Sequence, residues 1–350
     1  MVIRTKTFLE SYAEDIKLFR TIWIKFWVGA FVASLLILPM IGNPYSVYLI
    51  NLSCINIIAA LGLNILTGFT GQISMGHGAF FAIGAYCTAI LSNRFELPFW
   101  ICLPASAILG AITGLLIGIP CLRLKGLYLA IATMSFTVVI EYVVITWDSL
   151  TYGVRGISLK YLNLFGFPLN SNNKLYYFLI LITALAIIGM TNLSRTRVGR
   201  AFFAIRDREI AAATIGINLT QFKTLAFVIS SLYAALAGGL YAYLMGYVHP
   251  EHFTLMLSIT FIAMIIVGGF GTVLGSIFGA VFIIVVPEVI RISAQTLGQL
   301  IPEIANKYNE ECNVAVFGLL IIIFLIFEPK GLFGIWGRVK NFFKDWPFPS

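Results

Sequence analysis

Runs of apolar residues, each long enough to form a membrane-spanning helix, follow one another along almost the whole chain. A helix needs roughly 20 apolar residues to cross the hydrocarbon core of a bilayer. Only 11% of the 350 residues are charged, whereas a soluble domain carries about 25% charged residues. The chain lacks the polar residues that would coat a water-soluble globule, so lipid is its expected solvent and partner.

Ten runs are candidate spans, so the predicted fold class is an all-α integral membrane protein with about ten transmembrane helices. The run over 275–293 is the least regular, because Pro287, Glu288 and Arg291 favour a break or an early end. Glu288 and Arg291 are three residues apart on that helix and are spaced to pair. The candidate spans cover residues 22–42, 46–66, 76–92, 98–119, 127–146, 174–192, 224–248, 254–270, 275–293 and 314–328.

The distribution of basic residues predicts which segments face the cytoplasm. With the N-terminus inside, 17 of the 23 lysines and arginines fall on the inner side or at inner span ends, as the positive-inside rule requires. We therefore expect a cytoplasmic segment over 1–21, a transmembrane region over 22–328 and a cytoplasmic tail over 329–350. Residues 147–173 then form an outer loop, and residues 193–223 form an inner loop.

The stretch "LTGFTGQISMGHGAFFAIGAY", residues 66–86, interrupts the apolar pattern with five glycines and several polar residues. Irregular backbone at membrane depth occurs where protein or a water-filled cavity satisfies it. One interpretation is a bend or re-entrant turn that lines a translocation route, with Gln72, Ser74 and His77 supplying hydrogen-bonding groups. The other is close helix packing at small residues beside an ordinary cytoplasmic turn. A related pattern, "VGGFGTVLGSIFGAVF" over 267–282, leaves an internal repeat open.

The inner loop contains "GRAFFAIRDREIAAATIGIN", residues 199–218, whose composition predicts one short helix. Phe202, Phe203, Ile210 and Ala213 fall on one broad face of that helix, and Gly216 and Asn218 are placed to end it. Such a helix lies on lipid headgroups or docks into a groove on another protein. The mixed signs of its charges favour the protein partner.

Other features bear on the class of function. Glu141 is ionisable and lies within a span, which makes it a candidate for the substrate pathway or a side chain that reaches the outer interface. "HPEHF", residues 249–253, is expected to form a turn rather than a metal site. No GxxxxGK[ST], GxSxG or HExxH motif is present, so we expect no ATP hydrolysis, catalytic residue, metal or cofactor in this chain. The net charge of +8 lies in short clusters between spans, which argues against a nucleic-acid partner.

Several stretches resemble one family. "LNILTGFTGQISMGHGAFFAIGAY", "GLYLAIATMSF", "RVGRAFFAIRDREIAAATIGIN" and "PEHFTLMLSITFIAMIIVGGFGTVLGSIFGA" are similar to the LivM-type permease subunits of branched-chain amino acid ABC importers. The resemblance covers residues 45–293 and continues at "FEPKGLFGIWGR", residues 327–338. In the outer loop the family more often has a glycine where Tyr152 stands.

The resemblance implies a type II ABC importer fold, a place in the bacterial inner membrane with both termini cytoplasmic, and a set of partners. These are a second homologous permease, two cytoplasmic ATPases that use ATP, and a periplasmic substrate-binding protein. It also implies a cytoplasmic coupling helix with a pattern like EAA-xxx-G, in which Ile210 replaces the glutamate and Glu209 lies one position before it. The residues expected to couple to the ATPases are Arg200, Arg206, Asp207, Glu209, Ala211, Ala212 and Gly216.

The sequence therefore predicts a transmembrane permease subunit of an ATP-driven importer for branched-chain amino acids. A permease for urea or short amides resembles it and stays an alternative. A self-contained channel or secondary carrier is a further alternative, and Glu141 is the residue that such a protein would use. An integral-membrane enzyme has no motif that favours it.

Overall fold

A computed structural model describes residues 34–40, 42–121, 124, 126–159, 163–164, 167–168, 172–300, 318–319, 321–322, 324, 326–328 and 331–345. The chain divides into two compact units, residues 1–47 and residues 48–350. In the first unit, residues 34–40 form a helix. The first four residues of α3, 44–47, also belong to the first unit, and the second unit contains all other elements described below.

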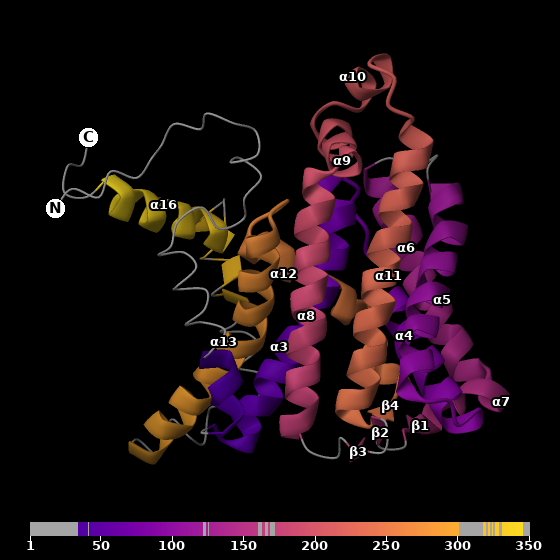
Figure 1. Cartoon of the computed structure of the whole chain (residues 1–350), viewed down its shortest axis with the longest axis vertical. Helices are drawn as coiled ribbons and strands as arrows, with labels where there is room; N and C mark the ends of the chain where they lie inside the picture. Colours follow the sequence, from indigo (N-terminus) through magenta and orange to yellow (C-terminus); the bar gives the residue numbers. More distant parts are fainter. Residues whose placement is uncertain are drawn as a thin grey trace. The chain divides into compact units, whose positions relative to one another are not determined.

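Long helices make up most of the second unit (Figure 1). They are α3 (Pro44–Leu63) with its π-helical extension η1 (Asn64–Phe69), α4 (His77–Arg94), α5 (Phe99–Cys121), α6 (Leu127–Thr146), α8 (Asn172–Arg195), α11 (Leu219–Met245), α12 (Leu255–Gly268) and α13 (Val273–Leu300). The shorter helices are α7 (Asp148–Thr151), η2 (Gly153–Arg155), α9 (Arg197–Asp207), α10 (Glu209–Thr214), η3 (Pro250–Phe253) and α16 (Gly331–Asp345). Two pairs of two-residue antiparallel strands complete the unit: β1 (Ile157–Ser158) with β4 (Tyr247–Val248), and β2 (Asn163–Leu164) with β3 (Phe167–Pro168).

Seven helices of the described residues are long and apolar enough to cross a membrane. They are Pro44–Phe69, Phe99–Cys121, Leu127–Thr146, Asn173–Arg195, Leu219–Met245, Pro250–Gly268 and Val273–Ser293. Each coincides with a predicted span, so the all-α membrane fold is confirmed. The predicted spans over 22–42 and 314–328 lie largely or partly outside the described residues, and the total of about ten spans stays a prediction.

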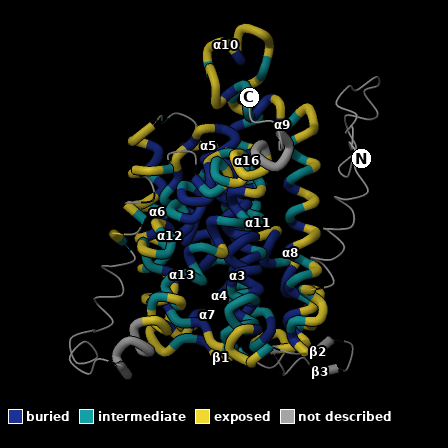
Figure 2. Tube along the Cα trace, turned by 90° about the vertical axis from the view of Figure 1, so that its left-hand side faces the viewer, coloured by how far each residue is buried: buried dark blue, intermediate teal, exposed yellow. Residues whose placement is uncertain are grey.

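The predicted span over 76–92 is α4, which occupies the centre of the second unit. Its ends carry His77, Asn93 and Arg94, and it is not among the seven described helices that are long and apolar enough to cross a membrane. Twelve of its 18 residues are buried, and α5, α6, α11 and α12 pack around it. Buried positions accordingly concentrate along α3, α4 and α11 (Figure 2). A helix surrounded by protein does not need the hydropathy of one that faces lipid.

Glycine and alanine residues bring the backbones of α4, α5 and α11 together. A Cβ atom added at Gly238 of α11 would lie 1.9 Å from the carbonyl oxygen of Phe81 in α4. A Cβ atom added at Gly84 of α4 would lie 2.0 Å from the carbonyl oxygen of Ala235 in α11. Helices in a membrane associate through such small-residue contacts, because lipid is as apolar as the side chains and no hydrophobic force drives them together.

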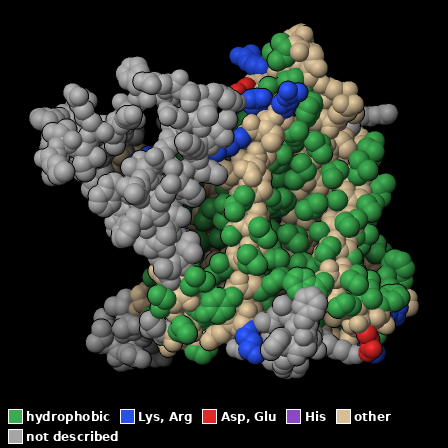
Figure 3. Space-filling model, viewed as in Figure 1, with side chains coloured by type: hydrophobic (Ala, Val, Ile, Leu, Met, Phe, Trp, Pro, Cys, Tyr) green, Lys and Arg blue, Asp and Glu red, His purple; other side chains and the backbone are tan. Residues whose placement is uncertain are grey.

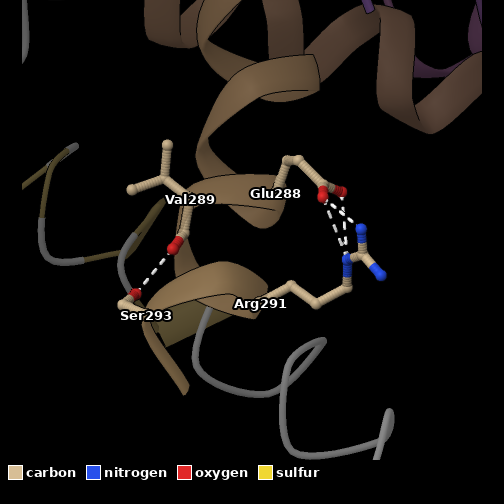
Figure 4. A network of polar contacts seen from close by, with 4 residues as sticks. All are labelled: Glu288, Val289, Arg291 and Ser293. Carbon is tan, nitrogen blue, oxygen red and sulfur yellow. Dashed lines mark hydrogen bonds and ion pairs between the residues drawn. The ribbon is translucent and has the colours of Figure 1, made fainter. Parts of the chain in front are cut away.

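Helix α13 does not break or end early at Pro287, contrary to the prediction from the sequence. Residues 273–300 form a continuous helix through Pro287, so the predicted break is wrong; neighbouring groups in a membrane protein can compensate for the hydrogen bond that proline removes. The predicted pair is confirmed: Arg291 Nε donates to Glu288 Oε1 at 3.0 Å, and Ser293 Oγ donates to the Val289 carbonyl oxygen at 2.5 Å (Figure 4).

The two long loops lie at opposite ends of the second unit (Figure 1). We call the end that carries α9 and α10 the α9 end, and the end that carries α7, β1 and β4 the β1 end. Hydrophobic side chains cover the flank between the two ends, and lysines and arginines lie toward the ends (Figure 3). The predicted separation of loops 147–173 and 193–223 onto opposite sides is therefore confirmed, although neither side is assigned to a compartment by this geometry.

Two details of the β1 end test further expectations. Residues 250–253 form a helical turn in which His249 contacts Glu251 at 3.7 Å, and no metal-binding group occurs among the described residues. The expected turn is thus confirmed. Tyr152 has a φ of 59°, a left-handed conformation that favours glycine, which accounts for the glycine that related permeases more often have here.

We predict that Gly238→Ala lowers the free energy of unfolding by about 1–3 kcal/mol, because the added methyl group forces α4 and α11 apart. The melting temperature of the purified chain in detergent measures the effect. Gly337→Ala in α16 is the matched control, since no atom lies within 4 Å of its added Cβ and alanine is the better helix former. Equal melting temperatures for Gly238→Ala and the unchanged chain would contradict the close contact.

Candidate functional site

The glycine-rich stretch is re-entrant. After η1 ends at Phe69, residues 70–76 form neither helix nor strand, and α4 begins at His77. The His77 ring nitrogen Nε2 lies 2.8 Å from the carbonyl oxygen of Ala59, ten residues before Phe69. At 1.5 Å per residue, the start of α4 lies roughly 15 Å back along the preceding helix. We call residues 70–76 the re-entrant segment.

Two threonines of α6 bond the backbone of Met75 in the re-entrant segment. The Met75 amide donates to Thr133 Oγ1 at 2.9 Å, and Thr137 Oγ1 donates to the Met75 carbonyl oxygen at 3.2 Å. Both threonines are buried in the interior of α6. Non-helical backbone is stable at this depth because these hydroxyl groups replace the missing helical partners. The chain bends here and packs closely at small residues, and the interpretation that the bend lines a translocation route stays a prediction.

Ser74 and His77 hold the shape of this segment. Ser74 is 1% exposed, and its Oγ accepts a hydrogen bond from the Gly76 amide at 3.3 Å. His77 is also 1% exposed, and its ring packs edge-on against Phe261 of α12 with centroids 5.5 Å apart. Next to it, the Gly78 amide donates to Ser258 Oγ of α12 at 2.9 Å. In this conformation both predicted pathway residues make contacts inside the protein, and neither lines one of the cavities described below.

Gln72 lines a cavity at the α9 end. The cavity has a volume of about 190 Å³. Gln72 is 8% exposed, and among the described residues neither its amide nitrogen nor its amide oxygen has a hydrogen-bond partner. The lining residues are Thr70, Gly71, Gln72, Leu124, Gly126, Leu129, Ile205, Arg206, Glu209 and Lys223.

Three charged side chains face this cavity. Lys223 Nζ of α11 lies 2.6 Å from Glu209 Oε1 of α10, and the Lys223 side chain is only 9% exposed. Arg206 Nη1 of α9 donates to the carbonyl oxygen of Gly68 in η1 at 3.0 Å. Arg206 also lies 3.4 Å from Asp207, whose side chain is 68% exposed. The cavity wall thus joins both helices of the inner loop to the helices that surround the re-entrant segment.

Glu141 lies in a different place. It borders a cavity of about 10 Å³ together with Tyr86 of α4 and Phe253 of η3, a space on the scale of a single water molecule. The Tyr86 hydroxyl, which has no hydrogen-bond partner among the described residues, belongs to the same wall. Glu141 and Gln72 lie toward opposite ends of α4, so the structure does not bring the four predicted pathway residues into one site.

Sequence reasoning missed Thr133, Thr137 and Lys223. One face of α6 carries polar residues at every fourth position, Thr133, Thr137 and Glu141. This spacing is a sequence signal for the two threonines, and it is missed when Glu141 is considered alone. Lys223 was counted only as a basic residue of the inner loop. Its place five residues into α11, next to an apolar run, was the available signal that it is buried.

The inner loop forms two helices, so the prediction of one helix over 199–218 is wrong. Thr196 caps α9 by accepting a hydrogen bond from the Gly199 amide at 3.3 Å. The chain becomes extended at Arg208, with φ −155° and ψ 98°, and α10 follows. Gly216 ends α10 with a φ of 90° as expected, whereas Asn218 instead caps the start of α11.

The break at Arg208 divides the predicted apolar face between α9, which carries its two phenylalanines, and α10, which carries Ile210 and Ala213. Phe202 is fully buried under α9. Ile210 of α10 is 81% exposed and Ile215 just after it is 74% exposed. The remaining coupling candidates divide in the same way: Ala212 is buried, whereas Arg200, Ala211 and Gly216 are exposed. The loop therefore presents an apolar tip beyond the α9 end.

The second glycine-rich stretch meets the first at the α9 end. Asn64 of η1 donates through Nδ2 to the Thr272 carbonyl oxygen at 2.9 Å, and its Oδ1 accepts from the Gly271 amide at 3.0 Å. Gly68-Phe69 forms the end of η1 and Gly269-Phe270 follows the end of α12, and in each stretch a Gly-Ala pair lies within the first turns of the next helix. The internal repeat stays a prediction, and this geometry supports it.

Comparison with known proteins finds permease components of branched-chain amino acid transport systems. A family model described as "Branched-chain amino acid transport system / permease component" matches residues 45–325. The chain is 32% identical over 330 residues to the high-affinity branched-chain amino acid transport system permease protein LivM of Salmonella typhimurium and to that of Escherichia coli, covering 86% of this chain and 74% of each relative. It is 26% identical over 296 residues to the permease protein LivH of Escherichia coli, covering 79% of this chain and 90% of LivH. No solved structure matches the chain significantly.

We predict that a water-soluble thiol reagent labels Gln72→Cys in a chain whose five native cysteines have been replaced. Gln72 faces the cavity, whereas Ser74 and His77 are enclosed by protein, so Ser74→Cys and His77→Cys serve as the matched controls and resist labelling. Mass spectrometry of the labelled protein in membrane vesicles measures the modified fraction. Equal labelling at all three positions would contradict the described orientation of the segment.

Proposed function

Because this chain belongs to the family of branched-chain amino acid transport permease components, we propose that it is the transmembrane permease subunit of an ATP-driven ABC importer for branched-chain amino acids. The family match and the seven apolar helices establish a multi-pass membrane protein. The observation that carries the mechanism is the hydrogen bond from Arg206 to the Gly68 carbonyl oxygen, because it joins the inner loop to η1, which directly precedes the re-entrant segment.

The proposed partners follow from the relatives. Similarity to both LivM and LivH supports a second, homologous permease beside this chain. Two cytoplasmic ATPases would supply ATP hydrolysis, and a periplasmic binding protein would deliver the substrate at the β1 end. Under this proposal the chain lies in the bacterial inner membrane with both termini in the cytoplasm, and it binds no cofactor itself.

Coupling would run through the inner loop. The exposed side chains of Ile210 and Ile215 suit a groove on an ATPase, since a helix docks through its apolar side chains. When the ATPases close, α10 and α9 would move together, and Arg206 would transmit the movement to Gly68. Gly68 lies in η1, and π-helical turns such as η1 frequently occur at functional sites. The re-entrant segment begins just after this point.

Reconstitution in liposomes tests the proposed function. The chain with its partner permease, two ATPases and loaded binding protein is expected to accumulate labelled leucine only when ATP is inside. Competition with unlabelled urea and acetamide separates the amino-acid permease from a permease for short amides. Leucine flux through the chain alone, without ATPases, would instead establish a self-contained channel or carrier and overturn the proposal.

We predict that Arg206→Gln uncouples transport in this assembly. Losing a hydrogen bond from a charged group costs about 1.5–3 kcal/mol, so uptake should fall by roughly 10- to 100-fold while ATP hydrolysis continues. Uptake and phosphate release are measured on the same vesicles. Arg197→Gln, at an exposed position on the first turn of α9, is the matched control. Tight coupling in the Arg206→Gln assembly would refute the route through Gly68.

A further inference from the structure

The cavity at the α9 end contains the groups that would recognise a free amino acid. We propose that it is a substrate-binding site within this single chain, specific for a zwitterion with a branched apolar side chain. The substrate would occupy this site before it leaves the protein at the α9 end. The inference rests on the proposed function for its ligand class. It adds a site that the fold, the family and the relatives' names do not assign.

Charge supplies the first part of the argument. Lys223 and Glu209 present one positive and one negative group 2.6 Å apart at the cavity wall. An amino acid carries a carboxylate and an ammonium group at a similar spacing, so each end finds an opposite charge if it inserts between them. Arg206, the third charged side chain of the wall, is held by the Gly68 carbonyl oxygen. Lys223 is assigned to the substrate carboxylate because its side chain is the more buried of the two cations, 9% exposed against 38% for Arg206.

Gln72 supplies an independent observation. Its side chain is more than nine-tenths buried and lines the cavity, and among the described residues neither of its amide atoms has a partner. A buried amide without hydrogen bonds is unfavourable, and each such group calls for an explanation. A ligand carboxylate would accept from Nε2 and a ligand ammonium would donate to Oε1. The cavity thus offers the hydrogen bonds that an amino acid backbone needs.

The remaining wall fits the side chain of the substrate. Leu129 and Ile205 are buried and Leu124 is partly buried, and all three border the cavity. The volume of about 190 Å³ exceeds the roughly 150 Å³ of an engineered apolar cavity that binds benzene. A small branched apolar side chain fits beside these residues, with its charged end toward α10 and α11.

Occupancy of this site would act on the inner loop. Glu209 is the first residue of α10 and Lys223 belongs to α11, so the ion pair fastens α10 to the bundle. A zwitterion inserted between the two side chains would replace the direct contact with contacts to the ligand. The position of α10 would then depend on whether substrate is present.

The alternative is that the ion pair only fixes α10, and a charge reversal separates the two roles. The double variant Glu209→Lys with Lys223→Glu keeps an ion pair but exchanges the sites for carboxylate and ammonium. In the reconstituted assembly we expect leucine uptake to fall at least about tenfold, the effect of losing one charge-assisted hydrogen bond, while ATP hydrolysis continues. Gln72→Leu should reduce uptake similarly. Gln221→Leu, exposed on α11, is the matched control and should transport normally.

A second measurement needs only the purified full chain. A single cysteine at Leu124→Cys reports on the cavity, and L-leucine should slow its labelling. Leucinol, which lacks the carboxylate, and 4-methylpentanoate, which lacks the amine, should not protect. Normal uptake by the reversed pair, or equal protection by all three compounds, would overturn the site while leaving the proposed function intact. Absence of leucine import by the unchanged assembly would overturn the function, and protection by leucine alone would still support the site.

Discussion

Inside a bilayer there is no water to bond the backbone, so each N–H and C=O group needs a partner within the protein. The long helices meet this requirement by themselves. Residues 70–76 form neither helix nor strand, and among them the Met75 amide and carbonyl groups find their partners in Thr133 and Thr137 of α6. Contact with α6 therefore supports the re-entrant segment at Met75.

Small residues make that arrangement possible. Gly238 and Gly84 let α4 and α11 touch along their backbones, which places α4 at the centre and leaves α6 and α12 to enclose its beginning. The His77 contact with Ala59 then fixes the depth of the segment. Because these contacts fill the interior, Ser74 and His77 are enclosed by protein and bond to other protein groups. Gln72 differs from them, because it lies nearer the α9 end and faces a cavity.

Much of the fold could be predicted from the sequence, because apolar run length reports directly on bilayer thickness. The seven apolar helices and the opposite placement of the two long loops follow from that one relation. The break at Arg208 could not be predicted: the residues on both sides favour helix, and the burial of Phe202 against the bundle, which depends on tertiary contacts, decides where α9 must end. The burial of Lys223 depends in the same way on Glu209, a partner fourteen residues away.

Only part of the candidate site could be predicted, because the site too depends on tertiary contacts. Gln72 was identified because a polar residue in an apolar stretch is conspicuous, but its cavity is built from α6, α9, α10 and α11, whose meeting no single segment specifies. That meeting also links the two proposed roles of the chain. Arg206 and Glu209 belong to the inner loop and border the cavity, so any displacement of the loop changes the site. By thermodynamic reciprocity, a ligand that binds there must bias the position of the loop to the same extent. Substrate sensing and mechanical coupling would then be two consequences of one set of contacts.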